Sequence, residues 1–183
     1  MSLFSDRPGT ALLVVDVQVG VVADDWRRAE IVNRIAALAD RARAASVPVV
    51  WVRHSNASLI PGTDDWRLVP ELAPRRDEHI VEKKYGDAFE DTDLESVLAD
   101  KGIGHLVVCG AQSDACVVST CFGALVRGWD VTLVGDAHTT CDRSGAGVRA
   151  TPDAVIQEIN LIWRNRTAPG RTCSVVTADS LWG

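Results

Sequence analysis

A carboxylate stands near the end of a strongly apolar run early in the chain. Asp16 lies within residues 12–18, which read LLVVDVQ. Burying an unpaired carboxylate costs several kcal/mol, so Asp16 needs a cationic or hydrogen-bond-donating partner, or else it has a raised pKa. Its position is consistent with an acid–base group and equally with a carboxylate that caps a neighbouring loop.

Cys116 is the candidate nucleophile. It lies six residues past Gly110, in the segment GAQSDACV, where an apolar run gives way to a helical pattern. A thiol at a helix N-terminus feels the positive end of the helix dipole, which lowers its pKa from about 8.5 into a range of about 3.5–7.5. The alternative is a small buried hydrophobic residue, which is common for free cysteine. We expect that alternative for Cys109, Cys121 and Cys173, and the sequence does not decide for Cys141.

Two adjacent lysines, Lys83 and Lys84, supply a possible cation for Asp16. They follow a short apolar turn at Ile80 and Val81 and precede the segment YGDAF. Most lysine pairs are solvated on the surface. One of the two can still pair with Asp16 if the chain brings it inward.

Short apolar runs alternate with helical patterns along the chain, and these elements must position the three groups. The runs are rich in valine and apolar on both faces, as buried parallel strands are; they cover residues 11–17, 47–52, 105–109, 131–134 and 173–176. Alternating strands and helices predict an α/β fold with a doubly wound, mostly parallel sheet that has helices on both faces. Ligands in such sheets bind at the carboxyl ends of the strands.

Four helices are expected between these strands. The first spans about residues 26–45, and the third spans residues 116–127. The second begins at a capping box formed by Thr92 and Glu95, and the fourth begins at Thr151, a cap followed by a proline at the first helical position.

A long segment without periodicity is a candidate pocket wall. Residues 54–77 exceed the usual length of a connection and contain three prolines, and long ordered loops are often functional. Trp66, Phe89 and His138 are candidates to line the substrate pocket. Each also has a plain structural interpretation, as loop packing or as a cap.

Length and composition exclude several classes of protein. The 183 residues, of which 46% are apolar and 24% charged, predict one globular domain over residues 1–183. A formal net charge of −6 disfavours nucleic acid as a partner. The apolar stretch at residues 11–22 is too short to span a membrane, and the N-terminus does not read as a signal peptide, so we expect a cytoplasmic protein. The five cysteines form no C-x-x-C pair, which gives no support to a disulfide framework or a structural zinc site.

Taken in order, four segments resemble the isochorismatase-like cysteine hydrolases, a family that includes nicotinamidases and N-carbamoylsarcosine amidase. The segments are residues 11–18, 83–94, 110–117 and 135–139, and the likeness runs from about residue 10 to 178. The resemblance implies a catalytic triad of Asp16, Lys83 and Cys116. It selects Lys83 over Lys84 because the family lysine stands six residues before a phenylalanine, here Phe89.

The resemblance also implies a cis peptide bond between Ala111 and Gln112 and an oxyanion hole formed by the backbone amides of Gln112 and Cys116. One departure concerns metal. Metal-binding nicotinamidases carry an Asp-x-His pair after the second strand, where this chain reads VRHSN around His54. No two of the four histidines have the spacing of metal ligands, so we expect no bound metal ion, and we expect no cofactor. Because the nicotinamidases of this kind bind a metal, the expectation argues against nicotinamide as the substrate.

These features predict a hydrolase that cleaves a C–N bond of a small amide or ureide through a thioester intermediate. The alternatives are hydrolysis of the vinyl ether of isochorismate, a catalytically silent binding or scaffold protein, and a redox thiol protein. The redox alternative needs a resolving cysteine, and Cys121, five residues along a helix from Cys116, points away from it. Family members commonly form dimers or tetramers, so we expect a homo-oligomer.

Overall fold

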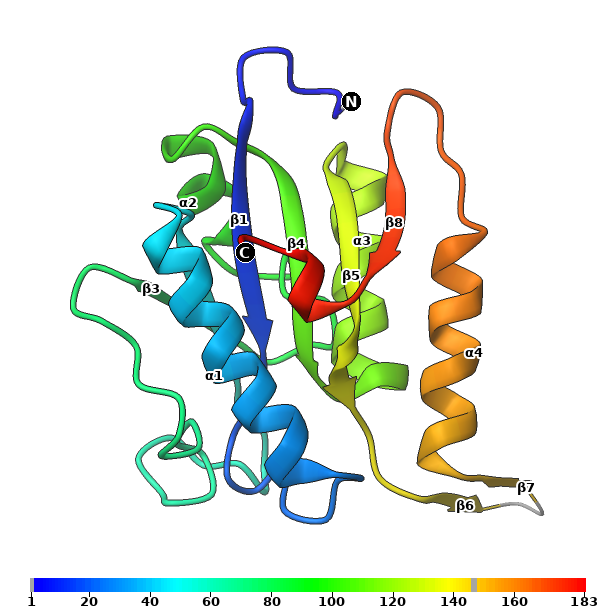
Figure 1. The fold of residues 1–183 in the computed structure, drawn as a ribbon. Helices are drawn as coiled ribbons and strands as arrows, with labels where there is room; N and C mark the ends of the chain where they lie inside the picture. The colour runs from blue at the N-terminus through cyan, green and yellow to red at the C-terminus, as the bar shows by residue number, and fades with distance from the viewer. Residues whose placement is uncertain (1, 146–147) are drawn as a thin grey trace.

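The computed structural model describes residues 2–145 and 148–183, and a six-stranded parallel sheet forms its centre (Figure 1). The strand order is β3-β2-β1-β4-β5-β8, and every neighbouring pair is parallel. The strands are β1 (Gly9–Val15), β2 (Val49–His54), β3 (His79–Lys83), β4 (Ile103–Ala111), β5 (Asp130–Thr139) and β8 (Cys173–Val176). Two short strands, β6 (Arg143–Gly145) and β7 (Val148–Ala150), form a separate antiparallel pair.

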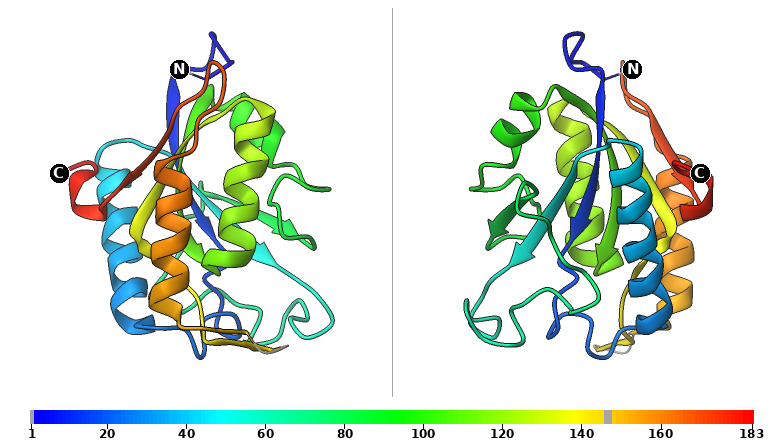
Figure 2. Two further views of the ribbon diagram at one scale, coloured as in Figure 1. Left: turned by 90° about the vertical axis from the view of Figure 1, so that its right-hand side faces the viewer. Right: turned by 60° about the vertical axis from the view of Figure 1, so that its left-hand side comes forward.

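Helices cover both faces of the sheet, so the predicted three-layer α/β architecture is confirmed (Figure 2). One face packs against α1 (Arg28–Ala44), with the short 3-10 turn η2 (Ala178–Ser180) beside it. The other face packs against α2 (Leu94–Asp100), α3 (Val118–Arg127) and α4 (Pro152–Arg164). Among the described residues, no helix combines the length and the apolar character needed to cross a bilayer.

The chain changes direction across the sheet between β1 and β4. Strands β2 and β3 extend the sheet on one side of β1, whereas β4, β5 and β8 extend it on the other. A crevice at such a switch point, at the carboxyl ends of the strands, is where ligands bind in open α/β sheets. Gly110, near the end of β4, has a φ of 125°, and a Cβ there would lie 2.1 Å from the carbonyl oxygen of Val15. Only glycine lets the two central strands approach this closely beside the crevice.

Two local predictions are wrong. Ile80 and Val81 belong to the edge strand β3 and not to a turn. The apolar signal of this strand is short because the polar residues His79 and Glu82 flank these two residues, and Glu82 is exposed. The capping box is not formed, because the Thr92 hydroxyl accepts from the amide of Leu94 at 3.3 Å and not from that of Glu95, while it donates to the carbonyl of Ala88 at 2.6 Å. The cap at Thr151 is confirmed, since its side chain accepts from the amide of Ala154.

Candidate active site

Three side chains from distant parts of the sequence meet at the switch point. The Nζ of Lys83 lies 2.6 Å from Oδ2 of Asp16 and donates to Sγ of Cys116 at 3.1 Å. The side chains of Asp16 and Lys83 are almost fully buried, and Cys116 is half-buried. The structure therefore brings together the three residues that the sequence proposed as a triad.

Each of the three residues lies at the end of a strand or within a few residues after it. Asp16 comes after β1, where the backbone turns with a φ of 50° and the amide donates to the carbonyl of Val52 at 3.0 Å. Lys83 is the last residue of β3 and points inward, whereas Lys84 is exposed, as the alternation of an extended segment requires. Cys116 lies in η1 (Ser113–Val117), one turn of π-helix between β4 and α3.

Burial dominates the electrostatics of this cluster. It raises the pKa of Asp16, and the charge of the nearby Lys83 ammonium offsets only part of the rise. Burial also raises the pKa of Cys116 to about 12; the charge of Asp16 adds to this shift, and Lys83 opposes it. The predicted lowering of the thiol pKa is therefore wrong, because desolvation outweighs any gain from the helix dipole.

The segment before Cys116 is fixed by a polar network. The peptide bond between Ala111 and Gln112 is cis. The Gln112 carboxamide donates to Asp25 at 2.8 Å and accepts from Arg143 at 2.6 Å. Asp25 is buried, and burial raises its pKa to about 6. Among the hydrogen bonds of turns, loops and caps in the described residues, none is donated by the backbone N–H of Gln112.

A second buried chain of hydrogen bonds supports the same turn from the other side. His138 has no exposed surface; its Nδ1 lies 2.7 Å from the hydroxyl of Ser113, and its Nε2 lies 3.1 Å from Oδ1 of Asn160. Burial lowers the pKa of His138, so its ring is neutral. His138 thus connects η1 to α4 through protein groups alone.

The other two residues proposed to line the pocket differ in their surroundings. Trp66 is partly exposed; the Arg53 guanidinium lies 3.5 Å above its ring, and its carbonyl accepts from Gln18 at 2.8 Å. Phe89 is buried in the core against Trp129, with ring centroids 5.0 Å apart. A lining role for Trp66, Phe89 and His138 stays a prediction.

The sequence missed His54 as a member of the cluster. Its Nδ1 lies 3.2 Å from Nζ of Lys83, and the two residues are partners in the register of β2 and β3. A ring nitrogen of His54, a carboxylate oxygen of Asp16 and Sγ of Cys116 all lie within 4.8 Å of one another, which is a spacing that can hold a metal ion. The Lys83 ammonium contacts all three groups, so a positive charge already occupies their centre.

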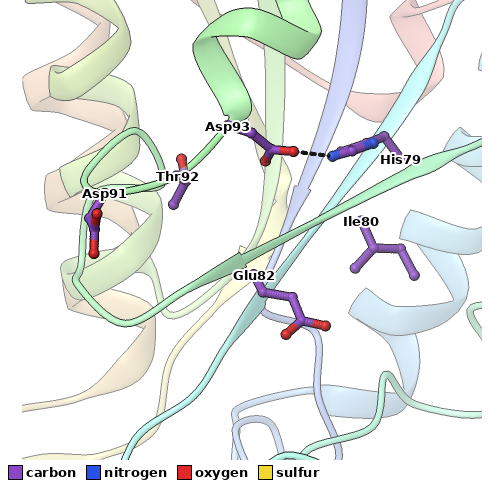
Figure 3. Close-up of a pocket in the computed structure, with 6 residues that line it drawn as sticks. All are labelled: His79, Ile80, Glu82, Asp91, Thr92 and Asp93. Atoms are coloured by element: carbon purple, nitrogen blue, oxygen red, sulfur yellow. Dashed lines mark hydrogen bonds and ion pairs between the residues drawn. The ribbon is translucent and has the colours of Figure 1, made fainter.

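An open surface cavity of about 660 Å³ lies away from this cluster (Figure 3). It is bounded by the edge strand β3 and by the segment that precedes α2, and His79 contacts Asp93 across it at 2.9 Å. Glu82 lines this cavity from the side of β3 opposite to that of Lys83. Neither Asp16 nor Cys116 borders it.

A buried carboxylate, a lysine and a cysteine meet at the switch point of this parallel α/β sheet. Comparison with known proteins shows which family the chain belongs to. Residues 10–151 match the isochorismatase domain family. The chain is 38% identical over 165 residues to a streptothricin hydrolase of Streptomyces noursei, covering 86% of this chain and 65% of that protein. It is 28% identical over 147 residues to nicotinamidase 3 of Arabidopsis thaliana, covering 71% of this chain and 73% of that protein.

The solved structures agree with this assignment. An isochorismatase from Pseudomonas putida superposes with a TM-score of 0.85 at 27% identity, covering 97% of this chain and 92% of that one. The chain belongs to the isochorismatase family, and the resemblance seen in the sequence is confirmed. It spans 65% and 52% of the length of the two streptothricin hydrolases that it matches.

Proposed function

We propose that this protein is a cysteine hydrolase that cleaves the C–N bond of a small amide or ureide through a thioester on Cys116. The observation that carries the proposal is the position of the Lys83 ammonium, 2.6 Å from the Asp16 carboxylate and 3.1 Å from the Cys116 sulfur. The relatives named as hydrolases of streptothricin and of nicotinamide support the class of reaction.

Proton transfer to Asp16 drives the first half of the reaction. Burial raises the pKa of the Cys116 thiol well above neutral pH, so the thiol is mostly protonated there and a base must remove its proton as the sulfur attacks. Asp16 takes that proton; its raised pKa makes it a stronger base than an exposed carboxylate. The C–S bond forms while the carbonyl oxygen becomes an oxyanion, and the backbone amides of Gln112 and Cys116 stabilise it.

The second half returns the enzyme to its starting state. The oxyanion collapses, the C–N bond breaks, and the leaving nitrogen takes the proton from Asp16. Water then gives a proton to Asp16 and attacks the thioester carbon. The C–S bond breaks, the sulfur recovers its proton, and the carboxylic acid leaves. Throughout both halves, the charge of Lys83 stabilises the anionic forms of Asp16 and Cys116.

Ammonia release from a panel of small primary amides and ureides tests the proposal. We expect Cys116→Ala to remove hydrolysis while the protein stays folded, because the substitution removes the nucleophile. Cys121→Ala is the control, since Cys121 is buried in the core and its loss affects packing. Activity above a few per cent in Cys116→Ala would contradict the proposal. Hydrolysis of isochorismate alone would favour the vinyl-ether alternative, and no hydrolysis by the native protein would favour a silent member of the fold.

The same assay tests the expectation that no metal is required. Because Lys83 supplies the positive charge at the centre of the cluster, we expect exhaustive chelation to leave the rate unchanged. Loss of activity to a chelator and its return on addition of zinc, iron or manganese would contradict this.

We also propose that the protein is a homo-oligomer. Large apolar side chains are exposed on α3 and α4, namely Val126, Leu161 and Ile162. Sedimentation at micromolar concentration tests this, and a mass of 19.7 kDa, that of one chain, would contradict it.

A further inference from the structure

His54 is held rigidly beside the catalytic groups. The Gln18 carboxamide binds both of its backbone polar groups: Oε1 accepts from His54 N at 2.7 Å, and Nε2 donates to His54 O at 2.9 Å. Gln18 is itself fully buried and also donates to the carbonyl of Trp66. The backbone of His54 is therefore fixed at the end of β2, next to Lys83.

The contact with Lys83 determines which ring nitrogen carries the proton. The ammonium has three N–H groups and faces four acceptors: Asp16, Cys116, the carbonyl of Tyr85 at 3.0 Å, and Nδ1 of His54 at 3.2 Å. An ammonium only donates, so a hydrogen on Nδ1 would point at another donor, and this disfavours the Nδ1–H tautomer. A neutral ring then carries its hydrogen on Nε2. Burial and the charge of Lys83 both lower the pKa of His54, which keeps the ring neutral at neutral pH.

The other charged groups near the ring do not change this assignment. They are the Asp16 carboxylate after β1 and, on the residues next to His54 and Lys83 in the sequence, the pair formed by Arg53 and Glu82, which bind each other at 2.6 Å; the Cys116 thiol in η1 is neutral. Asp16 is already paired with Lys83.

The Nε2–H group of His54 is left without a partner. No described residue accepts from it, and it is not among the unpaired atoms that the fold closes off from solvent. One nitrogen of the ring lies within 4.8 Å of the Cys116 sulfur, so the imidazole stands beside the atom that a substrate carbonyl has to approach. A hydrogen-bond donor that has no partner and lies beside the nucleophile favours a substrate that carries a matching hydrogen-bond acceptor.

We propose that His54 is a specificity-determining residue that donates a hydrogen bond from Nε2 to a second acceptor on the substrate, beyond the scissile carbonyl. The substrate class is then narrower than small amides in general: it comprises diamides, ureides and related compounds with a carbonyl close to the one that is attacked. This inference rests on the proposed function, because it places the substrate carbonyl at Cys116.

Two amides of equal size and shape test the proposal. Malonamide carries a second carboxamide where 3-methylbutanamide carries an isopropyl group. We expect the native protein to prefer malonamide by at least tenfold in kcat/KM, or in protection of Cys116 from iodoacetamide if turnover is slow. His54→Asn keeps an acceptor near Lys83 but is too short to place a donor at Nε2, so the preference falls to threefold or less. His54→Gln, whose amide reaches that position, restores part of it.

His79→Asn is the matched control, because His79 lies on the edge strand β3 and pairs with Asp93. It should leave the preference unchanged. Equal treatment of the two amides by the native protein, or an undiminished preference in His54→Asn, would overturn the proposal. Ammonia release that survives Cys116→Ala would instead refute the proposed function, and the ratio of the two amides would still decide the role of His54.

Nitrogen NMR of the histidine rings gives a second test that needs no substrate. We expect His54 to show the neutral Nε2–H form at pH 7.5 and to titrate below its usual pKa. An Nδ1–H tautomer or a charged ring at that pH would contradict the assignment.

Discussion

Two pairs of a carboxylate and a cation, Glu78 with Arg43 and Asp16 with Lys83, lie at opposite ends of the strands. They differ in the number of hydrogen bonds that the carboxylate accepts. At the amino end, Glu78 accepts two hydrogen bonds from Arg43, at 2.7 and 2.8 Å, one from Trp51 and one from the backbone of Arg75. At the carboxyl end, Asp16 has Lys83 at 2.6 Å, but neither of its oxygens receives a well-aligned hydrogen bond from the described residues.

The pKa values of the two carboxyl groups shift in opposite directions, because Asp16 is the more deeply buried of the two as well as the one with fewer hydrogen bonds. Burial alone would raise the pKa of Glu78, but the hydrogen bonds from Arg43, Arg75 and Trp51 outweigh it and hold that pKa below its usual value. Burial raises the pKa of Asp16, and Lys83 does not cancel the effect. A carboxylate that accepts several hydrogen bonds keeps its charge and stabilises the fold, whereas a buried carboxylate with few hydrogen bonds is ready to take a proton.

Exchanging each carboxyl for an amide should separate these two roles most strongly. We expect Asp16→Asn to lower turnover by about 10² to 10⁴, because the base that accepts the thiol proton is lost. Glu78→Gln should leave turnover per folded molecule within twofold. Steady-state ammonia release, corrected for the folded fraction by circular dichroism, is the measurement. Similar losses in both variants would remove the distinction between the two pairs.

The two adjacent lysines test which cation belongs to the reactive pair. Lys83 lowers the pKa of the Cys116 thiol, so Lys83→Ala should raise that pKa and slow alkylation of Cys116 at pH 8 by about tenfold or more. Lys84 is exposed and points away, so Lys84→Ala should change the rate by less than twofold. Peptide mapping after timed treatment with iodoacetamide measures both. The opposite outcome would reassign the lysine by one residue.

The structural pair should control stability and its dependence on pH. Arg43→Ala leaves the partly buried carboxylate of Glu78 without its cation, although Trp51 and Arg75 still donate to it, so we expect it to cost about 1.5–3 kcal/mol of unfolding free energy. Because the folded-state pKa of Glu78 is lowered, its stabilising effect is present above the unfolded pKa and disappears as pH falls through the folded one. Urea unfolding of the native protein and of Glu78→Gln should thus differ at pH 7, and the difference should shrink as pH falls below the usual pKa of a glutamate, about 4.3, toward the lower pKa of the folded state. A constant difference would contradict this.

Asp25→Asn should have the smallest effect of these substitutions. The change of stability with pH that Asp25 causes has the opposite sign to that of Glu78. The pKa of Asp25 rises to about 6 in the folded protein, so the folded state binds the proton more tightly, and stability falls as pH increases through this range. Asp25→Asn removes that loss and should raise the melting temperature at pH 8 by ~2–6 °C, with little change at pH 4. Scanning calorimetry at the two pH values is the measurement. A lower melting temperature at pH 8 would show that the contact with Gln112 needs the charge.

Local signals predicted the elements that depend on local chemistry. Thr151 and the proline after it fixed the start of α4, and the valine-rich run at residues 131–134 marked the core of β5. The strand β3 was missed because it lies at the edge of the sheet, and its exposed Glu82 and partly exposed His79 interrupt the apolar signal.

The parts of the site that depend on packing could not be predicted from the sequence. The spacing to Phe89 in the family selected Lys83, but nothing local shows that desolvation raises the thiol pKa of Cys116. His54 was passed over because its partner, Lys83, is 29 residues away and comes beside it only through the pairing of β2 with β3. Side-chain periodicity describes one strand at a time and does not contain that register.

Mass spectrometry of the enzyme quenched in acid during turnover tests the central claim most directly. The proposed chemistry forms a thioester, so the peptide that contains Cys116 should carry the mass of the substrate acyl group. The adduct should form before the acid product accumulates, and it should disappear when the substrate is exhausted. Hydroxylamine should release it, as it does thioesters in general. Continued ammonia release with no adduct on this peptide, or with an adduct on another residue, would contradict the assignment of Cys116 as the nucleophile.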